Sequence, residues 1–121
     1  MKQRSMQRLS NKQSAINRRL KKVYHSIAME RGHYCTGCGR ANVPLSHSHL
    51  ISRAKRPDLI CDPNNITYHC LSIGERKGCH ELWEGTLKDK QKLLDFHKSM
   101  EYILEMDYEH YHYITELSNK Y

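Results

Sequence analysis

The spacing of the cysteines constrains this chain more than any other feature, because a shared metal ion or a disulfide fixes which distant segments must meet. The segment Cys35-Thr-Gly-Cys38-Gly39 has two thiols with two residues between them, beside glycines that let backbone amides turn toward sulfur. This pattern is typical of a zinc knuckle, which supplies half of a tetrahedral site. The other half must come from Cys61, Cys70 and Cys79, which follow with eight residues between neighbours.

We predict that Cys70 and Cys79 complete the zinc site. Cys70 ends an apolar segment typical of a strand, and Cys79 opens a segment with helical periodicity, so both sulfurs can face one ion across the connecting loop. Cys61 lies in a polar connection, and we predict that it is a small buried hydrophobe. Structural zinc would add folding free energy to a chain of 121 residues of which only 38% are hydrophobic.

Disulfides are the other common use of five cysteines, and the expected compartment argues against them. No apolar stretch approaches the roughly 18 residues of a membrane span, and the N-terminus lacks the apolar core of a signal peptide. We therefore expect the protein in the cytoplasm, with no membrane partner. Thiols stay reduced there, so cysteines serve as metal ligands more often than as disulfides.

The hydrophobic pattern predicts an α+β fold in one compact domain. Residues 1–32 predict a basic amphipathic helix that ends near Gly32, and residues 33–86 predict a loop-rich core with strands at 43–52 and 66–70. Residues 87–121 predict a C-terminal helix and an aromatic tail that packs against the first helix. The apolar positions of the C-terminal helix are Leu87, Leu93, Leu94, Phe96, Met100, Ile103 and Leu104.

The first helix carries an apolar seam on one face. Its residues recur at alternating steps of three and four, which is the period of a helix that buries one stripe. Packing in cis against the core and pairing of two chains in a homodimer both fit this seam, and the sequence leaves both open. The seam consists of Met6, Leu9, Gln13, Ile16, Leu20, Val23 and Ile27.

The net charge of +7 is distributed unevenly along the chain. Residues 1–29 carry eight Lys or Arg and no acidic residue, whereas residues 81–121 carry five basic residues against nine acidic ones. A concentrated block of positive charge attracts polyanions. The sequence therefore predicts a polyanionic partner for the first helix, with nucleic acid as the leading candidate.

Residues 35–84 combine the cysteines with histidines and an asparagine in a particular order. The segment "SHLISR" at 48–53 follows the first cysteine pair, "NITYHC" at 65–70 ends in Cys70, and Cys79-His80 opens the next helix. In this order the residues resemble the HNH endonuclease family, in which a ββα-metal motif is braced by a four-cysteine zinc site. The resemblance implies a small zinc-braced ββα-metal (HNH) core flanked by the two terminal helices. It also implies a bacterial or bacteriophage protein that acts in the cytoplasm of the bacterial cell or phage-infected host.

The resemblance further implies hydrolysis of DNA phosphodiester bonds. Such a reaction needs a base for the attacking water, a metal that stabilises charge on the phosphate and the leaving oxygen, and a group that fixes the base. The resemblance assigns His49 as the base, His80 as a ligand of Mg²⁺ or another divalent cation, and Asn65 as the residue that fixes the loop carrying His49. Expected phosphate contacts are Arg53, Arg76 and Lys77.

The sequence departs from the family pattern just before the base. The family commonly has aspartate or histidine there as a second metal ligand, and this chain has Ser48, which is a poor ligand at neutral pH. His47 is one candidate for the missing ligand, because it shares a strand face with the base. Glu84 is another, because it lies four residues after His80 on one face of a helix. His69 is a third.

A second departure is the loop between Cys70 and Cys79. The family usually has a gap of two residues there, and this loop has eight, among them Glu75, Arg76 and Lys77. The extra residues leave the geometry of the second cysteine pair open and add positive charge beside the expected cleft.

Two other functions compete with the nuclease. A zinc-stabilised nucleic-acid-binding module without catalysis fits the basic helix and Ser48. An interaction adaptor that pairs through the apolar seam also fits, but it leaves the order of His49, Asn65 and His80 unexplained. Because duplex, junction, single strand and RNA share the same phosphodiester, the sequence selects none of them.

Overall fold

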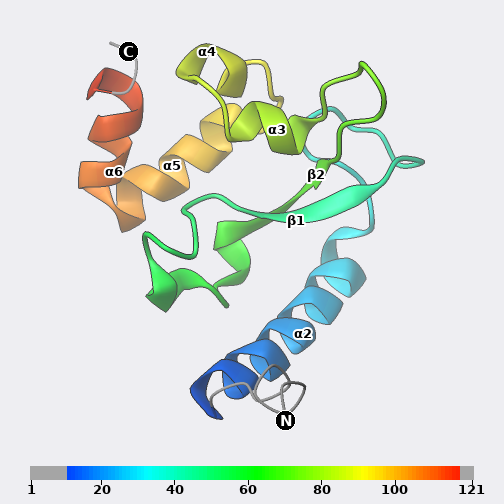
Figure 1. Ribbon diagram of the computed structural model, residues 1–121, viewed down its shortest axis with the longest axis vertical. Helices are drawn as coiled ribbons and strands as arrows, with labels where there is room; N and C mark the ends of the chain where they lie inside the picture. Colours follow the sequence, from blue (N-terminus) through cyan, green and yellow to red (C-terminus); the bar gives the residue numbers. More distant parts are fainter. Residues whose placement is uncertain (1–10, 118–121) are drawn as a thin grey trace, which may run out of the picture.

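The computed structural model describes residues 11–117 and has an α+β architecture, as predicted. Two antiparallel strands form a small central sheet, with one long helix on one side of it and several short helices on the other (Figure 1). The elements are α2 (Asn11–Arg31), β1 (Leu45–His49), β2 (Ile66–Cys70), α3 (Cys79–Trp83), α4 (Leu87–Lys90), α5 (Phe96–Met106) and α6 (Tyr108–His112), with 3₁₀ turns at Pro57–Leu59 and Pro63–Asn65 and a π-helical turn at Tyr113–Leu117.

The register of the sheet decides which side chains face each layer. Leu45 lies opposite Cys70, and His49 lies opposite Ile66. Because side chains alternate along a strand, Leu45, His47 and His49 share the face toward α2. Ser46 and Ser48 share the opposite face, toward α3.

The apolar seam of α2 packs in cis against the sheet along its second half. Leu20 and Ile27 are buried against Ile66 and Tyr68 of β2. Gly32, at a φ of +80°, follows the last helical residue, so the predicted stop is confirmed. Met6 and Leu9 of the seam lie outside the described residues. Over residues 11–117, no helix is long and apolar enough to cross a membrane.

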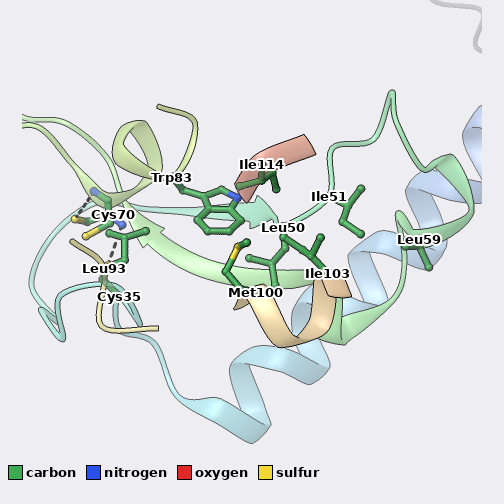
Figure 2. Packing of buried hydrophobic residues seen from close by; sticks show 11 residues of the cluster. Cys35, Leu50, Ile51, Leu59, Cys70, Trp83, Leu93, Met100, Ile103 and Ile114 are labelled. Carbon is green, nitrogen blue, oxygen red and sulfur yellow. Dashed lines mark hydrogen bonds between the residues drawn. The ribbon is translucent and has the colours of Figure 1, made fainter. Parts of the chain in front are cut away.

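The main core lies on the other side of the sheet, around Trp83 (Figure 2). Figure 2 shows Trp83 beside Met100 of α5 and Ile114 of the C-terminal turn. Ile114 and Tyr111 belong to this cluster, whereas the residues that contact α2 form a separate one. The prediction that the aromatic tail packs against the first helix is therefore wrong for its described residues. The tail packs on the Trp83 core instead, because Ile114 and Tyr111 bury apolar surface there.

The predicted single C-terminal helix is also wrong, because residues 87–117 form several short helical pieces. The N–H of Leu94 donates to the carbonyl of Gly37 (2.9 Å), which pulls the chain out of helical geometry between α4 and α5. Leu93 is buried as a result, whereas Leu94, one of the apolar positions of the predicted C-terminal helix, is 76% exposed. Asp107 adopts an extended conformation between α5 and α6, and its carboxylate accepts from the N–H of His110.

Candidate metal centre and histidine site

The four predicted cysteines converge at one end of the main core. The sulfur atoms of Cys35, Cys38, Cys70 and Cys79 all lie within 4.8 Å of one another. The prediction that Cys70 and Cys79 join the first pair is therefore confirmed. Four thiolates on one ion at about 2.3 Å would stand about 3.8 Å apart in a tetrahedron. The Sγ atoms of Cys38 and Cys70 are 3.8 Å apart, so the cluster is compatible with a structural metal site.

Backbone contacts shape the loop that carries the first pair. The N–H of Gly39 donates to the carbonyl of Cys35 (2.7 Å), and the N–H of Thr36 donates to Tyr68 of β2 (2.9 Å). Gly37 is required by close approach, because a Cβ there would lie 2.9 Å from the sulfur of Cys79. The chain thus brings the loop and the start of α3 together without a side chain between them.

Hydrogen bonds and burial set the charge of the thiols. The N–H of Cys70 donates to the sulfur of Cys35 (3.2 Å), and the N–H of Cys79 donates to that of Cys70 (3.3 Å). Burial opposes ionisation of Cys70, but hydrogen bonds from the Cys79 N–H, the Arg76 guanidinium and the thiols of Cys38 and Cys79 together outweigh it and lower its pKa to about 6. Burial and the neighbouring Cys35 raise the pKa of Cys79. A divalent cation would relieve this repulsion, because thiolates crowded this closely repel one another.

Cys61 stands apart from the cluster. Its thiol donates to the carbonyl of Ile16 in α2 (3.9 Å), and it packs at the edge of the layer formed by Leu20 and Ile66. Cys61 is therefore outside the cysteine cluster, as predicted, but it is only partly buried and not the fully buried residue that we predict from the sequence.

Asn65 joins the two ends of the segment that connects β1 to β2. Its fully buried amide donates to the carbonyls of Ile51 (3.1 Å) and Leu59 (3.2 Å) and accepts from the N–H of Ile51 (2.8 Å). Three hydrogen bonds in a buried setting hold a loop firmly, because breaking any of them leaves a polar group unpaired. Residues 50–65 are thus closed into a fixed loop.

His49 is held by that loop. Its Nε2 lies 2.9 Å from the carbonyl oxygen of Ile60, which follows the Leu59 held by Asn65. A carbonyl can only accept, so Nε2 carries the proton and Nδ1 of the neutral ring has the free electron pair. Burial lowers the pKa of His49 and the Arg53 charge lowers it further, while the Ile60 bond opposes both.

His80, Ser48 and Glu84 form a second polar group on the α3 side of the sheet. The buried hydroxyl of Ser48 is 2.7 Å from Nδ1 of His80, and Nε2 of His80 is 3.6 Å from a carboxylate oxygen of Glu84. The ring of His80 is one-third exposed and Glu84 is largely exposed. The structure therefore brings His80 and Glu84 together at the surface.

The two other candidate ligands lie elsewhere. His47 faces α2, where its ring stacks on Tyr24 with the centroids 3.7 Å apart. His69 is buried with its Nε2 3.0 Å from Asp95. Over residues 11–117, the four cysteines are the one group of three or more His, Cys, Asp or Glu side chains whose ligand atoms lie close enough together to share an ion. Within the described part of the chain, His80 and Glu84 therefore offer two protein donors and no third.

The predicted phosphate contacts differ in exposure. Arg53 is exposed and its guanidinium donates to the hydroxyl of Tyr24 (3.3 Å), which places it between β1 and α2. Lys77 is exposed as well. Arg76 is half-buried, and its guanidinium donates to the sulfur of Cys70 (3.8 Å) instead of facing solvent.

Two contacts at this site were not anticipated from the sequence. The first is the hydrogen bond from His49 to the carbonyl of Ile60. Every residue has a backbone carbonyl, so the residue type at position 60 does not predict this contact. Asp95 accepts hydrogen bonds from Thr36 (2.6 Å) and from His69, and the only available signal was its position before an apolar helix. Asp95 links the cysteine loop, β2 and the start of α5.

The described residues thus contain a four-cysteine cluster, a His49 ring held by a loop carbonyl on the α2 face of β1, and a His80–Glu84 pair on the opposite, α3 face of the sheet. No protein-family model, curated protein or solved structure matches this chain.

Proposed function

We propose that this protein is a metal-dependent HNH endonuclease that hydrolyses phosphodiester bonds in DNA. The observation that carries the proposal is the clamped histidine: Asn65 fixes the loop, and the loop carbonyl of Ile60 fixes the ring of His49. A purely structural histidine has no need of a free nitrogen, whereas a general base needs one electron pair free and the ring held still. The order of His49, Asn65 and His80 in the sequence supports the same assignment.

Zinc is the metal that best fits the four-cysteine cluster. Four sulfur donors within 4.8 Å of one another are the usual set for a structural Zn²⁺ site with no open position. Zinc in this position would supply folding free energy and no chemistry, because all four positions are taken by protein. It would join the loop at Cys35, the end of β2 and the start of α3.

His49 is the proposed general base. With Nε2–H bonded to the Ile60 carbonyl, Nδ1 can accept a proton from a water that attacks phosphorus. The imidazolium that forms keeps its hydrogen bond to Ile60, so the ring does not need to turn during proton transfer. The lowered pKa keeps the ring neutral, and so able to accept, at neutral pH.

Nε2 of His80 and the carboxylate of Glu84 are the proposed holders of the catalytic cation. Their separation of 3.6 Å leaves room for one ion between them. Ser48, which sits where the family commonly has a ligand, acts as the hydrogen-bond partner that orients His80 through Nδ1. A phosphate at the end of β1, between the α2 face that carries His49 and the α3 face that carries this pair, would let a bound divalent cation stabilise negative charge on the phosphate and the leaving oxygen. An imidazole beside a carboxylate suits Mn²⁺ better than Mg²⁺, which prefers oxygen ligands.

The basic faces of α2 are the proposed DNA contact. Lys12, Arg18, Arg19, Lys21 and Lys22 are all exposed along a helix whose apolar side is buried against the sheet. Arg53 extends this positive surface to the end of β1, beside His49. A DNA backbone that lies along α2 would therefore pass close to His49, the proposed base.

A zinc-stabilised nucleic-acid-binding module without catalysis is the second candidate function. The observation that favours it is the small number of ligands beside His80, because two protein donors bind a divalent cation weakly. This module would use α2 in the same way. The two functions differ only in whether phosphodiester bonds are cut.

Cleavage that depends on Glu84 tests the proposed function. We expect the protein to nick or cut plasmid DNA with Mn²⁺ and more slowly with Mg²⁺, and we expect Glu84→Gln to lower the Mn²⁺ rate by about 10-fold to 100-fold, because it weakens metal binding. The measurement is the single-turnover rate as a function of metal concentration. Glu75→Gln, which makes the same change in an exposed loop, should cleave normally. Intact plasmid with every divalent cation tried would favour the binding module.

The pH dependence of cleavage should report His49. Burial and the charge of Arg53 lower the pKa of His49 below 6.5, the ordinary pKa of histidine. The ring is therefore still mostly neutral at pH 6.5, and the base is lost only as the pH falls through this lowered pKa. We expect the acid limb of the single-turnover rate, measured from about pH 5 to about pH 8, to have its midpoint below 6.5. Arg53→Gln should move that midpoint upward. A midpoint above 6.5, with zinc still bound, would contradict this role for His49.

A further inference from the structure

The loop between Cys70 and Cys79 folds back on itself and returns Arg76 to the cysteine cluster. The backbones of Ile73 and Arg76 exchange two hydrogen bonds (3.0 and 2.9 Å), and Gly74 takes the left-handed conformation that the turn requires, at a φ of +57°. The hydroxyl of Ser72 accepts from the N–H of Gly78 (2.9 Å) and closes the base of the loop. The eight residues therefore form a defined hairpin.

The guanidinium of Arg76 is the group that this hairpin positions. Its Nη1 donates to the sulfur of Cys70 (3.8 Å), and its Nη2 is buried without a hydrogen-bond partner among residues 11–117. Its neighbours Glu75 and Lys77 are exposed, whereas Arg76 is half-buried. An arginine that binds phosphate would expose its guanidinium to solvent, whereas the guanidinium of Arg76 faces the cysteine cluster.

The negative charge of the four thiolates explains why a guanidinium beside Cys70 is favourable. Four thiolates around one divalent cation carry a net charge of −2. Three of the four cysteines are buried, so water solvates this charge poorly and a fixed cation nearby is worth more than it would be at the surface. The sulfur of Cys70 already accepts the N–H of Cys79, and Arg76 adds a charged donor to the same atom. Donors of this kind around a ligand commonly tune metal affinity.

We propose that Arg76 is an outer charge partner of the zinc centre, which strengthens zinc binding by offsetting the charge of the thiolates through Cys70. This inference rests on the zinc part of the proposed function and is independent of the nuclease part. It also gives the long loop a role, because the turn between Ile73 and Arg76 is what brings the Arg76 guanidinium to Cys70. Of the two basic residues in the hairpin, Lys77 alone stays free to contact phosphate.

Zinc affinity measured by competition with a chromophoric chelator tests the role of Arg76. We expect Arg76→Gln to weaken zinc binding by about 10-fold to 100-fold, because the uncharged amide cannot offset thiolate charge. Arg76→Lys should recover part of the loss. Lys77→Gln, the matched loss of one positive charge at the next residue, should bind zinc as the wild type does.

The absorption of the Co²⁺-substituted proteins provides the second measurement. Thiolate-to-cobalt absorption of wild-type intensity in Arg76→Gln would show that all four sulfurs still bind, so that weaker affinity reflects charge rather than a lost ligand. Unchanged zinc affinity in Arg76→Gln, or an equal loss in Lys77→Gln, would overturn the role of Arg76 and leave the zinc site in place. Failure of the wild type to bind zinc would overturn the site itself and this role with it.

Discussion

Replacing Cys79 with serine is expected to unfold the chain, the largest effect that we predict. Cys79 connects α3 to the loop at Cys35 and to the end of β2, and its sulfur is one of four within 4.8 Å of each other. Apparent binding free energies of structural zinc are about 10–16 kcal/mol, whereas small domains are stable by only about 5–15 kcal/mol. A chain that loses zinc therefore loses most of its folding free energy. Far-UV circular dichroism and zinc content of the purified protein measure both effects.

Cys61 provides the matched control for this prediction. Cys61→Ser removes a thiol of the same size from the same domain, but its sulfur contacts the backbone of α2 and no other cysteine. We expect this variant to bind one zinc per chain and to fold, with a loss of at most about 1–2 kcal/mol from its partly buried position. A Cys79→Ser protein that keeps the circular dichroism and melting temperature of the wild type without zinc would rule out the structural metal site.

His49→Ala is expected to lower the single-turnover rate of DNA cleavage by about 10²-fold to 10⁴-fold, the usual contribution of a general base. The ring lies at the end of β1 with only its Nε2 engaged, so its loss removes the proton acceptor and one hydrogen bond to Ile60. Zinc content and circular dichroism should remain those of the wild type. DNA affinity, measured without divalent metal, should change little, because α2 is untouched.

His47→Gln is the control that tests which histidine of β1 acts. His47 shares the strand and face of His49 but stacks on Tyr24 and contacts no loop carbonyl. We expect this variant to cleave within a few-fold of the wild type. A large loss of cleavage rate in His47→Gln, with normal cleavage by His49→Ala, would make His47 the base. Equal cleavage rates for the wild type, His47→Gln and His49→Ala would show that neither histidine is the base.

Local patterns predicted the parts of the site that depend on short stretches of chain. The choice of Cys70 and Cys79 over Cys61 came from their positions at the end of a strand and the start of a helix, and both elements are present. The C-terminal region was predicted poorly for the opposite reason. Its periodicity fits one helix, but the hydrogen bond between Leu94 and Gly37 joins residues far apart in sequence and breaks that helix.

The sheet decided which residue of β1 lies beside His80. Strand alternation allowed His47 as a ligand, yet the register turns it toward α2 and presents Ser48 to His80. Glu84 meets His80 because four residues make one turn of helix, a relation that the sequence did contain.

The sequence by itself determined the fold class, which four cysteines cluster, and the order of His49, Asn65 and His80, because these depend on residue type and on the local pattern around each residue. Only the tertiary structure decided that His49 is held by the Ile60 carbonyl and that Arg76 faces sulfur instead of phosphate. In both contacts, a loop folds back onto the residue that precedes it: Ile60 onto His49, and Arg76 onto Cys70. The path of such a loop is set by buried hydrogen bonds between distant residues, which leave no periodic pattern in the chain.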